Sequence, residues 1–217
     1  MSARLASSGL GTVVKVPGAE DFDEIEFQAA RTGNHLRAAV RMSDLARTAA
    51  AADKAAAADA DAAGISRAEA YLRAGDQWLM ADDPQRAADE FSRAIADGGQ
   101  TFADPRVPLA RAYFALGKDA EAESLISALR AEQDKATPRT CDLLAELLAD
   151  QGDLPTALEW ATMGVEQYLS RGENAEMQLL LRLRYRIRND LGLGEDDYDR
   201  MLDSGSPAAR GGRGPQR

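Results

Sequence analysis

The stretch Ala68–Gly99, AEAYLRAGDQWLMADDPQRAADEFSRAIADGG, decides the fold, because its local signals all favour two antiparallel helices. Its first half places apolar and small residues along one face of a helix, at Tyr71, Ala74, Gly75 and Trp78. Its second half carries another such face, at Ala87, Phe91 and Ala94. Between the two faces, Asp82 and Asp83 are suited to cap a helix that Pro84 opens. The stretch therefore predicts a helical hairpin.

This hairpin resembles the tetratricopeptide repeat (TPR), a two-helix unit of about 34 residues with the same order of aromatic, small and glycine positions. The chain repeats the pattern at intervals of 35 residues. The second copy has Leu109, Ala110, Tyr113, Ala122, Ile126 and Leu129. The third has Leu144, Ala145, Leu148, Ala157, Ala161 and Gly164. Small residues at these places allow two helix backbones to cross closely. Those expected at the crossings are Ala74, Gly75, Ala87, Ala122 and Ala157.

The resemblance implies an all-α fold, a right-handed solenoid of helical hairpins with about three TPR-like repeats over residues 67–172. Composition agrees, since 45% of the residues are hydrophobic but only 6% are aromatic. Alanine supplies much of the apolar content, and alanine favours helices over strands. Residues 173–192 are predicted to form a capping helix, with an arginine-rich outer face. Leu179, Leu180 and Leu183 are expected at its packing positions.

Residues 19–66 are predicted to hold N-terminal helices. The first is expected to have one apolar face, formed by Phe22, Ile25, Ala29 and Ala30. The next carries Ala38, Met42 and Leu45 at the repeat spacing, which leaves open a degenerate extra repeat. An alanine-rich helix is expected over residues 47–63.

Both ends of the chain are expected to be flexible. Residues 1–18 are rich in serine and glycine and are predicted to be disordered. Residues 193–217 read as an acidic and then basic flexible tail, with a short helix in the acidic part between Glu195 and Asp203.

Charge and cysteine content restrict the function classes. The formal net charge is −10 and the isoelectric point about 4.7, which disfavours binding to phosphate backbones. Only four of the 26 basic residues are lysines, which together with the alanine content indicates a high-GC bacterial genome. Cys141 is the only cysteine, stands at a packing position of the repeat and is interpreted as a small buried hydrophobe. With no signal peptide or apolar span in the sequence, we expect a cytoplasmic protein.

No catalytic, metal or cofactor site can be assembled from the sequence. His35 is the sole histidine, and it lies in a different structural unit from Cys141. Gly192–Gly194 precedes no strand-helix unit, so it is not a nucleotide-binding loop. Residues 195–199 lack the spacing and glycine of a calcium loop. The predicted protein is not an enzyme and has no cofactor.

The resemblance also implies a site, because the first helices of TPR hairpins line a concave groove that receives peptides or a partner helix. The matching positions are Glu69, Leu72, Asp76, Leu79, Met80, Val107, Arg111, Phe114, Arg139, Asp142 and Glu146, and the capping helix adds Met177, Leu181, Arg184 and Tyr185. This groove is expected to be apolar at its N-terminal end and mixed in charge towards its C-terminal end. Leu72 and Asp76 replace the Lys and Asn pattern of the family's chaperone-binding members, which disfavours a carboxylate clamp.

The predicted function is a non-catalytic adaptor or scaffold that binds another protein or a peptide, with no membrane and no nucleic acid as the expected partner. Two alternatives remain open. One is a self-associating structural protein, and the other is a regulatory subunit of an enzyme or RNA-containing complex that uses the face Arg182–Arg188. A further open alternative is that the chain's own alanine-rich helix covers the groove.

Overall fold

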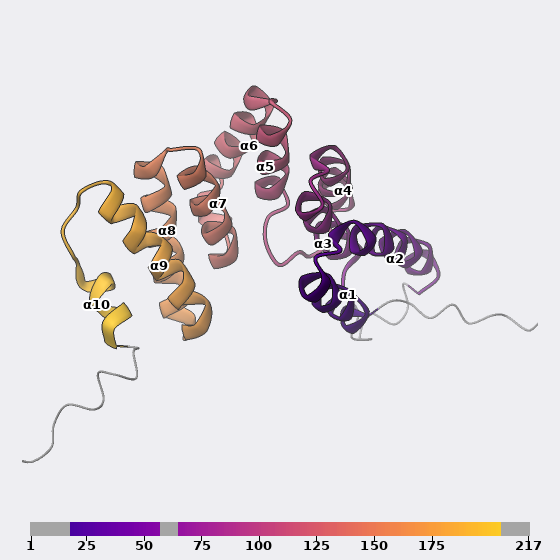
Figure 1. The fold of residues 1–217 in the computed structure, drawn as a ribbon, viewed down its shortest axis with the longest axis horizontal. Helices are drawn as coiled ribbons and strands as arrows, with labels where there is room; N and C mark the ends of the chain where they lie inside the picture. The colour runs from indigo at the N-terminus through magenta and orange to yellow at the C-terminus, as the bar shows by residue number, and fades with distance from the viewer. Residues whose placement is uncertain (1–17, 57–64, 205–217) are drawn as a thin grey trace, which may run out of the picture.

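A computed structural model describes residues 18–56 and 65–204, and within these ranges it is helical with no strand. The helices are α1 (Ala19–Thr32), α2 (His35–Ala56), α3 (Arg67–Met80), α4 (Pro84–Asp97), α5 (Arg106–Ala115), α6 (Asp119–Ala131), α7 (Pro138–Asp150), α8 (Leu154–Arg171), α9 (Asn174–Asp190) and α10 (Asp197–Ser204), with one 3₁₀ turn at Gln133–Lys135. They follow one another along an arch (Figure 1). The predicted all-α fold is confirmed.

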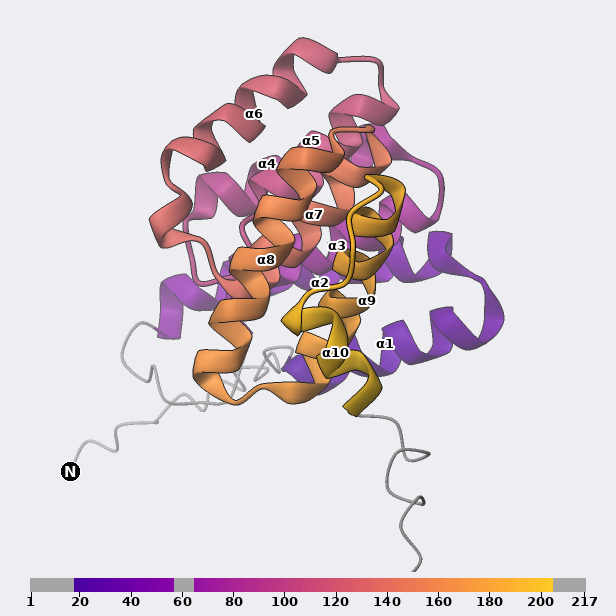
Figure 2. The same ribbon diagram turned by 90° about the vertical axis from the view of Figure 1, so that its left-hand side faces the viewer.

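Consecutive helices pack in pairs, α3 against α4, α5 against α6 and α7 against α8. Seen along the arch, α8, α9 and α10 stand in front of the N-terminal helices (Figure 2). Among the first helices of successive pairs, ion pairs described below also link α1 to α3 and α5 to α7. In the described ranges, no helix has the length and apolar character needed to cross a bilayer.

Local capping explains where the second helix of the central hairpin begins and ends. The Asp83 side chain accepts a hydrogen bond from the backbone N–H of Arg86 at 3.1 Å, which satisfies one of the free donors of the first turn. Pro84 is the first helical residue, where its missing N–H costs nothing. The helix ends at Gly98, whose φ of 69° is the left-handed conformation that glycine adopts most readily. The predicted turn chemistry is therefore confirmed.

Close helix crossings occur where the small residues were predicted. A Cβ atom on Gly75 would lie 2.4 Å from the Phe91 ring, so α3 and α4 approach one another too closely for any side chain there. Gly164 has a similar environment, with a Leu180 methyl 2.6 Å from the added Cβ. The alanines at the crossings, Ala74, Ala87, Ala122 and Ala157, are fully buried.

The core runs along the array as three clusters of buried side chains. The first joins α1, α2 and α3 around Phe22 and Met42. The second joins α3, α4 and α5 around Trp78 and Phe91. The third and largest extends from α5 to α9, and Cys141 is one of its members. Burial raises the pKa of the Cys141 thiol to about 12, so its interpretation as a small buried hydrophobe is confirmed.

Two predictions about helix faces are wrong. Ala30 is exposed, because the buried face of α1 turns towards α2 and α3 through Phe22, Ile25 and Ala29. Leu179 is also exposed, although its expected neighbour Leu180 is buried. The helix α9 packs mainly against α8 and also contacts α10. Its buried face consists of Met177, Leu180, Leu181, Arg184 and Ile187.

Several predicted segments lie wholly or partly outside the described residues. These are the N-terminal segment before residue 18, the end of the alanine-rich helix at residues 57–63 and the basic end of the tail. The described start of the alanine-rich stretch continues α2, which packs on α3. The helix expected in the acidic stretch Glu195–Asp203 is α10, which begins two residues later, at Asp197, and ends one residue beyond that stretch, at Ser204.

Candidate partner-binding surface

The first helices of the pairs carry a row of charged side chains, which we call the charged band. Its members are Asp23 and Glu26 of α1, Glu69, Arg73 and Asp76 of α3, Arg111 of α5, and Arg139, Asp142 and Glu146 of α7. Six of these residues are among those predicted from the sequence. The expectation that the N-terminal end of this face is apolar is wrong, because α1 and α3 contribute mostly charged groups there.

Ion pairs join the helices across the charged band. Arg73 of α3 contacts Asp23 at 2.6 Å and Glu26 at 2.5 Å, both on α1. Arg111 of α5 donates to a Glu146 carboxylate oxygen on α7 at 3.0 Å, and these two residues are 35 positions apart. The pair thus connects equivalent places in successive hairpins. Such partly exposed pairs contribute little stability but hold long side chains in defined positions.

Asp76 lies at the middle of the charged band and is half-buried. It makes no hydrogen bond or ion pair with another residue of the described ranges. Its pKa is raised to about 7, chiefly by burial and also by the negative charges of Glu26 and Glu69, while Arg111 and Arg139 act in the opposite direction. Asp76 therefore exchanges its proton near neutral pH.

The connection between α4 and α5 adds an aromatic side chain that the sequence analysis missed. The backbone N–H of Phe102 donates to a Glu69 carboxylate oxygen at 2.9 Å, and the guanidinium of Arg139 lies 5.4 Å from the centre of the Phe102 ring. The N–H of Asp104 donates to Thr140 Oγ1 at 3.0 Å. These contacts hold the loop against α3 and α7, yet 64% of the Phe102 surface remains exposed. The one sequence feature that could have indicated this residue is its aromatic side chain within an otherwise polar connection.

Five predicted site residues are buried, so their expected exposure is wrong. They are Leu72, Val107, Met177, Leu181 and Arg184. Leu72 and Val107 belong to the core clusters that hold neighbouring helices together. On α9, Met177 and Leu181 belong to the core cluster shared with α7 and α8, and Arg184 is covered by contacts with α10. Apolar side chains at helix seams enter the core whenever a neighbour is close enough to cover them.

The other predicted residues remain accessible to different degrees. Met80 and Tyr185 are exposed, Glu146 is exposed, and Leu79 is half-buried. Phe114 is half-buried and lines a separate cleft of about 510 Å³ between α6 and the α7–α8 turn. Ile126 and Leu148 are the other apolar residues of that cleft. Phe114 therefore belongs to the cleft as well as to the predicted groove.

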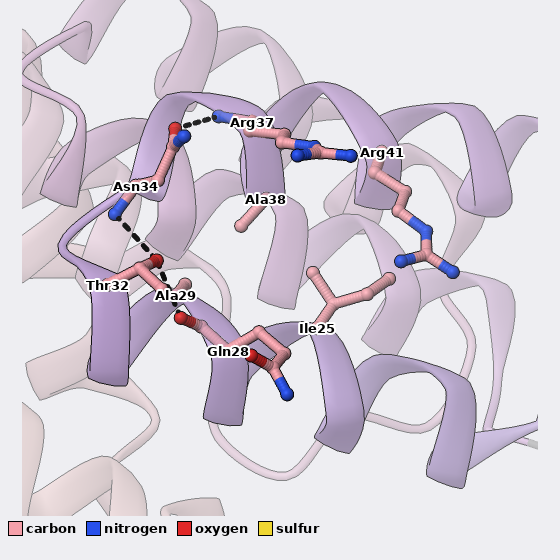
Figure 3. Close-up of a pocket in the computed structure, with 8 residues that line it drawn as sticks. All are labelled: Ile25, Gln28, Ala29, Thr32, Asn34, Arg37, Ala38 and Arg41. Carbon is pink, nitrogen blue, oxygen red and sulfur yellow. Dashed lines mark hydrogen bonds between the residues drawn. The ribbon is translucent and has the colours of Figure 1, made fainter.

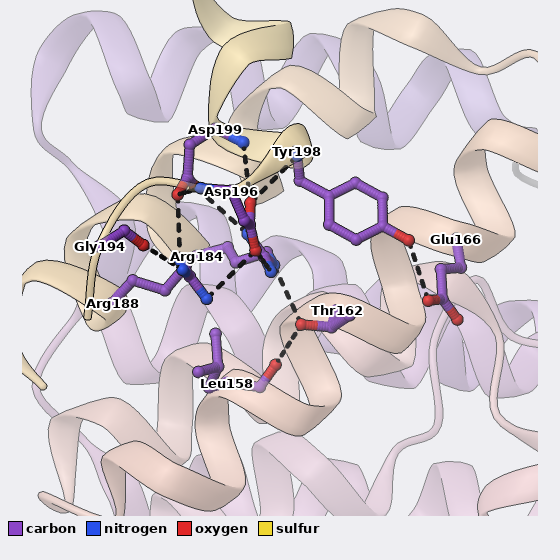
Figure 4. Close-up of polar contacts among 9 residues, drawn as sticks. All are labelled: Leu158, Thr162, Glu166, Arg184, Arg188, Gly194, Asp196, Tyr198 and Asp199. Atoms are coloured by element: carbon purple, nitrogen blue, oxygen red, sulfur yellow. Dashed lines mark hydrogen bonds and ion pairs between the residues drawn. The ribbon is translucent and has the colours of Figure 1, made fainter.

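The predicted arginine face of α9 is only partly available. Arg184 donates to carboxylate oxygens of Asp196 and Asp199, and Arg188 donates to Asp199 at 3.0 Å (Figure 4). Hydrogen bonds from Arg184 keep the pKa of Asp196 low, at about 2. Arg182 and Arg186 are exposed. We call the four interacting residues Arg184, Arg188, Asp196 and Asp199 the C-terminal cluster.

A small pocket of about 310 Å³ lies between α1 and α2 at the N-terminal end of the array (Figure 3). Ile25, Ala29 and Ala38 form its apolar part, and the guanidinium groups of Arg37 and Arg41 lie at its rim. His35 lies nearby in sequence, but its Nδ1 is 3.0 Å from Gln77 Oε1 and so it is occupied within the fold. Across the described residues, no three acidic, histidine or cysteine side chains gather in a way that could hold a metal ion.

Comparison with known proteins agrees with this geometry. Residues 79–139, from the end of α3 to the start of α7, match the tetratricopeptide repeat family. No curated protein sequence matches the chain.

Solved structures of TPR proteins resemble this chain to different degrees, and the first below has a similar fold. The crystal structure of nearly identical TPR-like repeats, from a Podosopora anserina protein named after the kinesin light chain, has a TM-score of 0.51 and 17% identity over 85% of this chain and 91% of that chain. The crystal structure of YrrB, a TPR protein with an unusual peptide-binding site, has a TM-score of 0.39 and 17% identity over 80% of this chain and 88% of that chain. The family match, the repeated small residues and the paired helices lead to one conclusion: residues 79–139 of this chain are tetratricopeptide repeat sequence, set within an array of similar helical hairpins.

Proposed function

We propose that this chain is a non-catalytic adaptor whose charged band binds a segment of a partner protein. TPR folds serve protein–protein interaction, and repeat arrays of this kind offer an extended surface rather than an enclosed catalytic site. The observation that carries the proposal is the combination, on one face, of an unpaired carboxylate at Asp76 and an exposed ring at Phe102. The Asp76 carboxylate has no partner within the described residues and most of the Phe102 surface is exposed, so both are suited to contact a second molecule.

Charge reversal within the charged band tests this proposal. In the native host, the tagged wild-type chain is purified with its partners and compared quantitatively with Arg111→Glu, which replaces attraction to Glu146 by repulsion. The matched control is Arg130→Glu on α6, because Arg130 and Asp153 form an ion pair of the same length, 3.0 Å, outside the band. A partner that is lost with Arg111→Glu and retained with Arg130→Glu supports binding at the band.

A partner that is retained with Arg111→Glu and lost with Arg130→Glu would bind to another surface. Arg130 lines the cleft that contains Phe114. A partner lost only with Arg130→Glu would therefore place the binding site in that cleft, and the proposal would be wrong.

Self-association is a second candidate, and one observation favours it. Phe27 of α1 and Leu36 and Val40 of α2 are exposed, and all belong to the outermost pair at the N-terminal end of the array. Exposed apolar residues at the end of a repeat array favour association with a second copy of the chain, because stacking would bury them. Light scattering on the wild type and on Phe27→Ser with Leu36→Ser tests this. A wild-type dimer that becomes monomeric in the double variant would favour self-association.

A further inference from the structure

The charged residues of the band, with one exception, are matched to a partner inside the molecule. Arg73 is paired with α1, Arg111 with Glu146, and Arg139 with Asp142. The Glu69 carboxylate accepts the N–H of Phe102. Within the described ranges, Asp76 alone among the members of the band has no such contact. The two positive groups that lower its pKa, Arg111 and Arg139, are each paired with a carboxylate of α7.

An unpaired carboxylate that is partly removed from water lowers the stability of the protein that carries it. The cost is relieved when a cation reaches the group, because a charged hydrogen bond then replaces the lost hydration. The surroundings of Asp76 favour a cation, since Glu26 and Glu69 are the acidic groups close enough to raise its pKa. The Asp76 carboxylate at the centre of the band is therefore suited to accept a hydrogen bond from a cationic group.

Two apolar groups flank this acceptor on α3. Met80 lies one helical turn beyond Asp76 on the same face and is exposed. In the other direction, Glu69, two turns away, accepts the backbone N–H of Phe102, whose side chain in the α4–α5 connection is exposed. Arginine and lysine side chains combine an apolar stem with a charged end, so they suit a surface in which apolar contacts surround one carboxylate.

We infer that the charged band recognises a partner segment through an arginine or lysine side chain whose cation pairs with Asp76, between Met80 and Phe102. The inference rests on the proposed function, because it names the chemistry of the ligand at that same surface. It distinguishes this chain from repeat proteins that hold the negatively charged end of a peptide. The overall charge of −10 is consistent with a cationic partner.

Proton exchange at Asp76 adds a second signature. A cation favours the ionised carboxylate, and at neutral pH the pKa of Asp76, about 7, leaves part of the population protonated. The titratable and charged groups that act on Asp76 come from every neighbouring first helix, namely Glu26 of α1, Glu69 of α3, Arg111 of α5 and Arg139 of α7. Binding of a cationic segment should therefore release protons and become tighter as the pH rises through neutrality.

Random peptides displayed on phage and selected on the wild-type chain provide the probe. We expect the selected peptides to be enriched in arginine or lysine at one position. A synthetic copy of the strongest binder is then titrated into the wild type and into Asp76→Asn, which we expect to bind about tenfold more weakly. The matched control is Glu121→Gln, because Glu121 is an exposed carboxylate of α6 outside the band. Replacing the basic residue of the peptide by glutamine should abolish the difference between wild type and Asp76→Asn.

The outcomes separate the inference from the proposed function. If selected peptides lose binding with Arg111→Glu but not with Asp76→Asn, the band binds partners without the predicted cation, and the inference fails while the proposed function stands. If the selected peptides bind at the band but are not enriched in arginine or lysine, the inference also fails while the proposed function stands. If no peptide binds, or if binding survives both substitutions, the charged band is not a binding surface and both fail.

Discussion

The charged band and the C-terminal cluster use the same chemistry for different ends. In the C-terminal cluster, the side chains of Arg184 and Asp199 are each only 4% exposed. In the band, the corresponding exposures are 37% for Arg111 and 48% for Glu146. Buried ion pairs are costly to break because the remaining charge has no water around it, whereas exposed pairs can exchange partners at little cost. The comparison shows that the burial of an ion pair, and not its residue types, decides whether the pair supports the fold or is available for binding.

The C-terminal cluster fixes the last helix to the array. Arg184 also donates to Thr162 Oγ1 of α8 at 3.0 Å, and its guanidinium lies 4.7 Å from the centre of the Tyr198 ring. The Tyr198 hydroxyl donates to Glu166 at 3.0 Å. Arg184 thus joins α8, α9 and α10 in one network (Figure 4). A repeat array needs a terminal element that covers its last apolar face, and this network holds that element in place.

The largest expected effect is the loss of Arg184. Arg184→Ala should lower the free energy of unfolding by about 3 to 5 kcal/mol, because the buried pair with Asp199 and the bonds to Asp196 and Thr162 would be lost together, leaving Arg188 as the remaining cation beside Asp199. Urea denaturation followed by circular dichroism measures the change. Arg182→Ala is the control on the same helix, since Arg182 is exposed. Equal effects of the two substitutions would show that the cluster is not a structural centre.

A smaller effect is expected at the helix crossing next to the charged band. Gly75→Ala should destabilise the chain by about 1 to 3 kcal/mol, because the new Cβ would meet the buried Phe91 ring. The substitution leaves the charge of Asp76 unchanged. Under conditions where the variant is still folded, it should therefore bind the selected peptide as the wild type does. Thermal unfolding and peptide titration on the same sample check both statements, and a stability equal to that of the wild type would refute the close crossing.

Much of the fold could be predicted from the sequence because the determinants are local. The cap at Asp83 and the small residue at Gly75 are visible in a window of a few residues, and repetition along the chain confirmed their register. The position of Phe102 was not accessible in this way. It depends on a contact with Glu69, 33 residues earlier in the chain, and on a loop whose path no periodic pattern describes.

The same limit explains the errors at the candidate site. Positions on an ideal repeat indicate which side of a helix faces the groove, but they do not show what else covers that side. Leu181 and Arg184 were assigned to the groove, yet both are buried, Leu181 within the core cluster that runs from α5 to α9 and Arg184 by its contacts with α10. Asp76 was assigned from the register and is half-buried in the structure, but its missing partner became visible only once the neighbouring helices were in place.

The smallest expected effect on stability is at the exposed pair of the band. Arg111→Ala should change the free energy of unfolding by less than about 1 kcal/mol, because both side chains of the pair remain in contact with water. Arg130→Ala should change the free energy of unfolding by a similarly small amount, since its pair with Asp153 is similarly exposed. Chemical denaturation of the two variants tests this. A loss for Arg111→Ala as large as that for Arg184→Ala would remove the contrast between the two regions.

The pH dependence of stability isolates the contribution of Asp76. Its pKa is raised from an ordinary value of 3.8 to about 7, so between these values the folded chain keeps a proton that the unfolded chain releases. The stability contributed by this group is fully present at low pH and is lost as the pH rises towards about 7. Asp76→Asn should abolish this part of the pH dependence. Denaturation curves across this range, for wild type and variant, measure the difference, and identical pH profiles would contradict the raised pKa.

The central claim is that Asp76 serves binding and lowers the stability of the fold. It is tested most directly by measuring two quantities for Asp76→Asn near neutral pH. These are the free energy of unfolding and the dissociation constant for the selected basic peptide, measured in one buffer against the wild type. We predict opposite changes: the variant is at least as stable as the wild type, because an unpaired carboxylate has been removed, and it binds the peptide more weakly. A variant that is less stable and binds equally well would show that Asp76 supports the fold and does not recognise a partner.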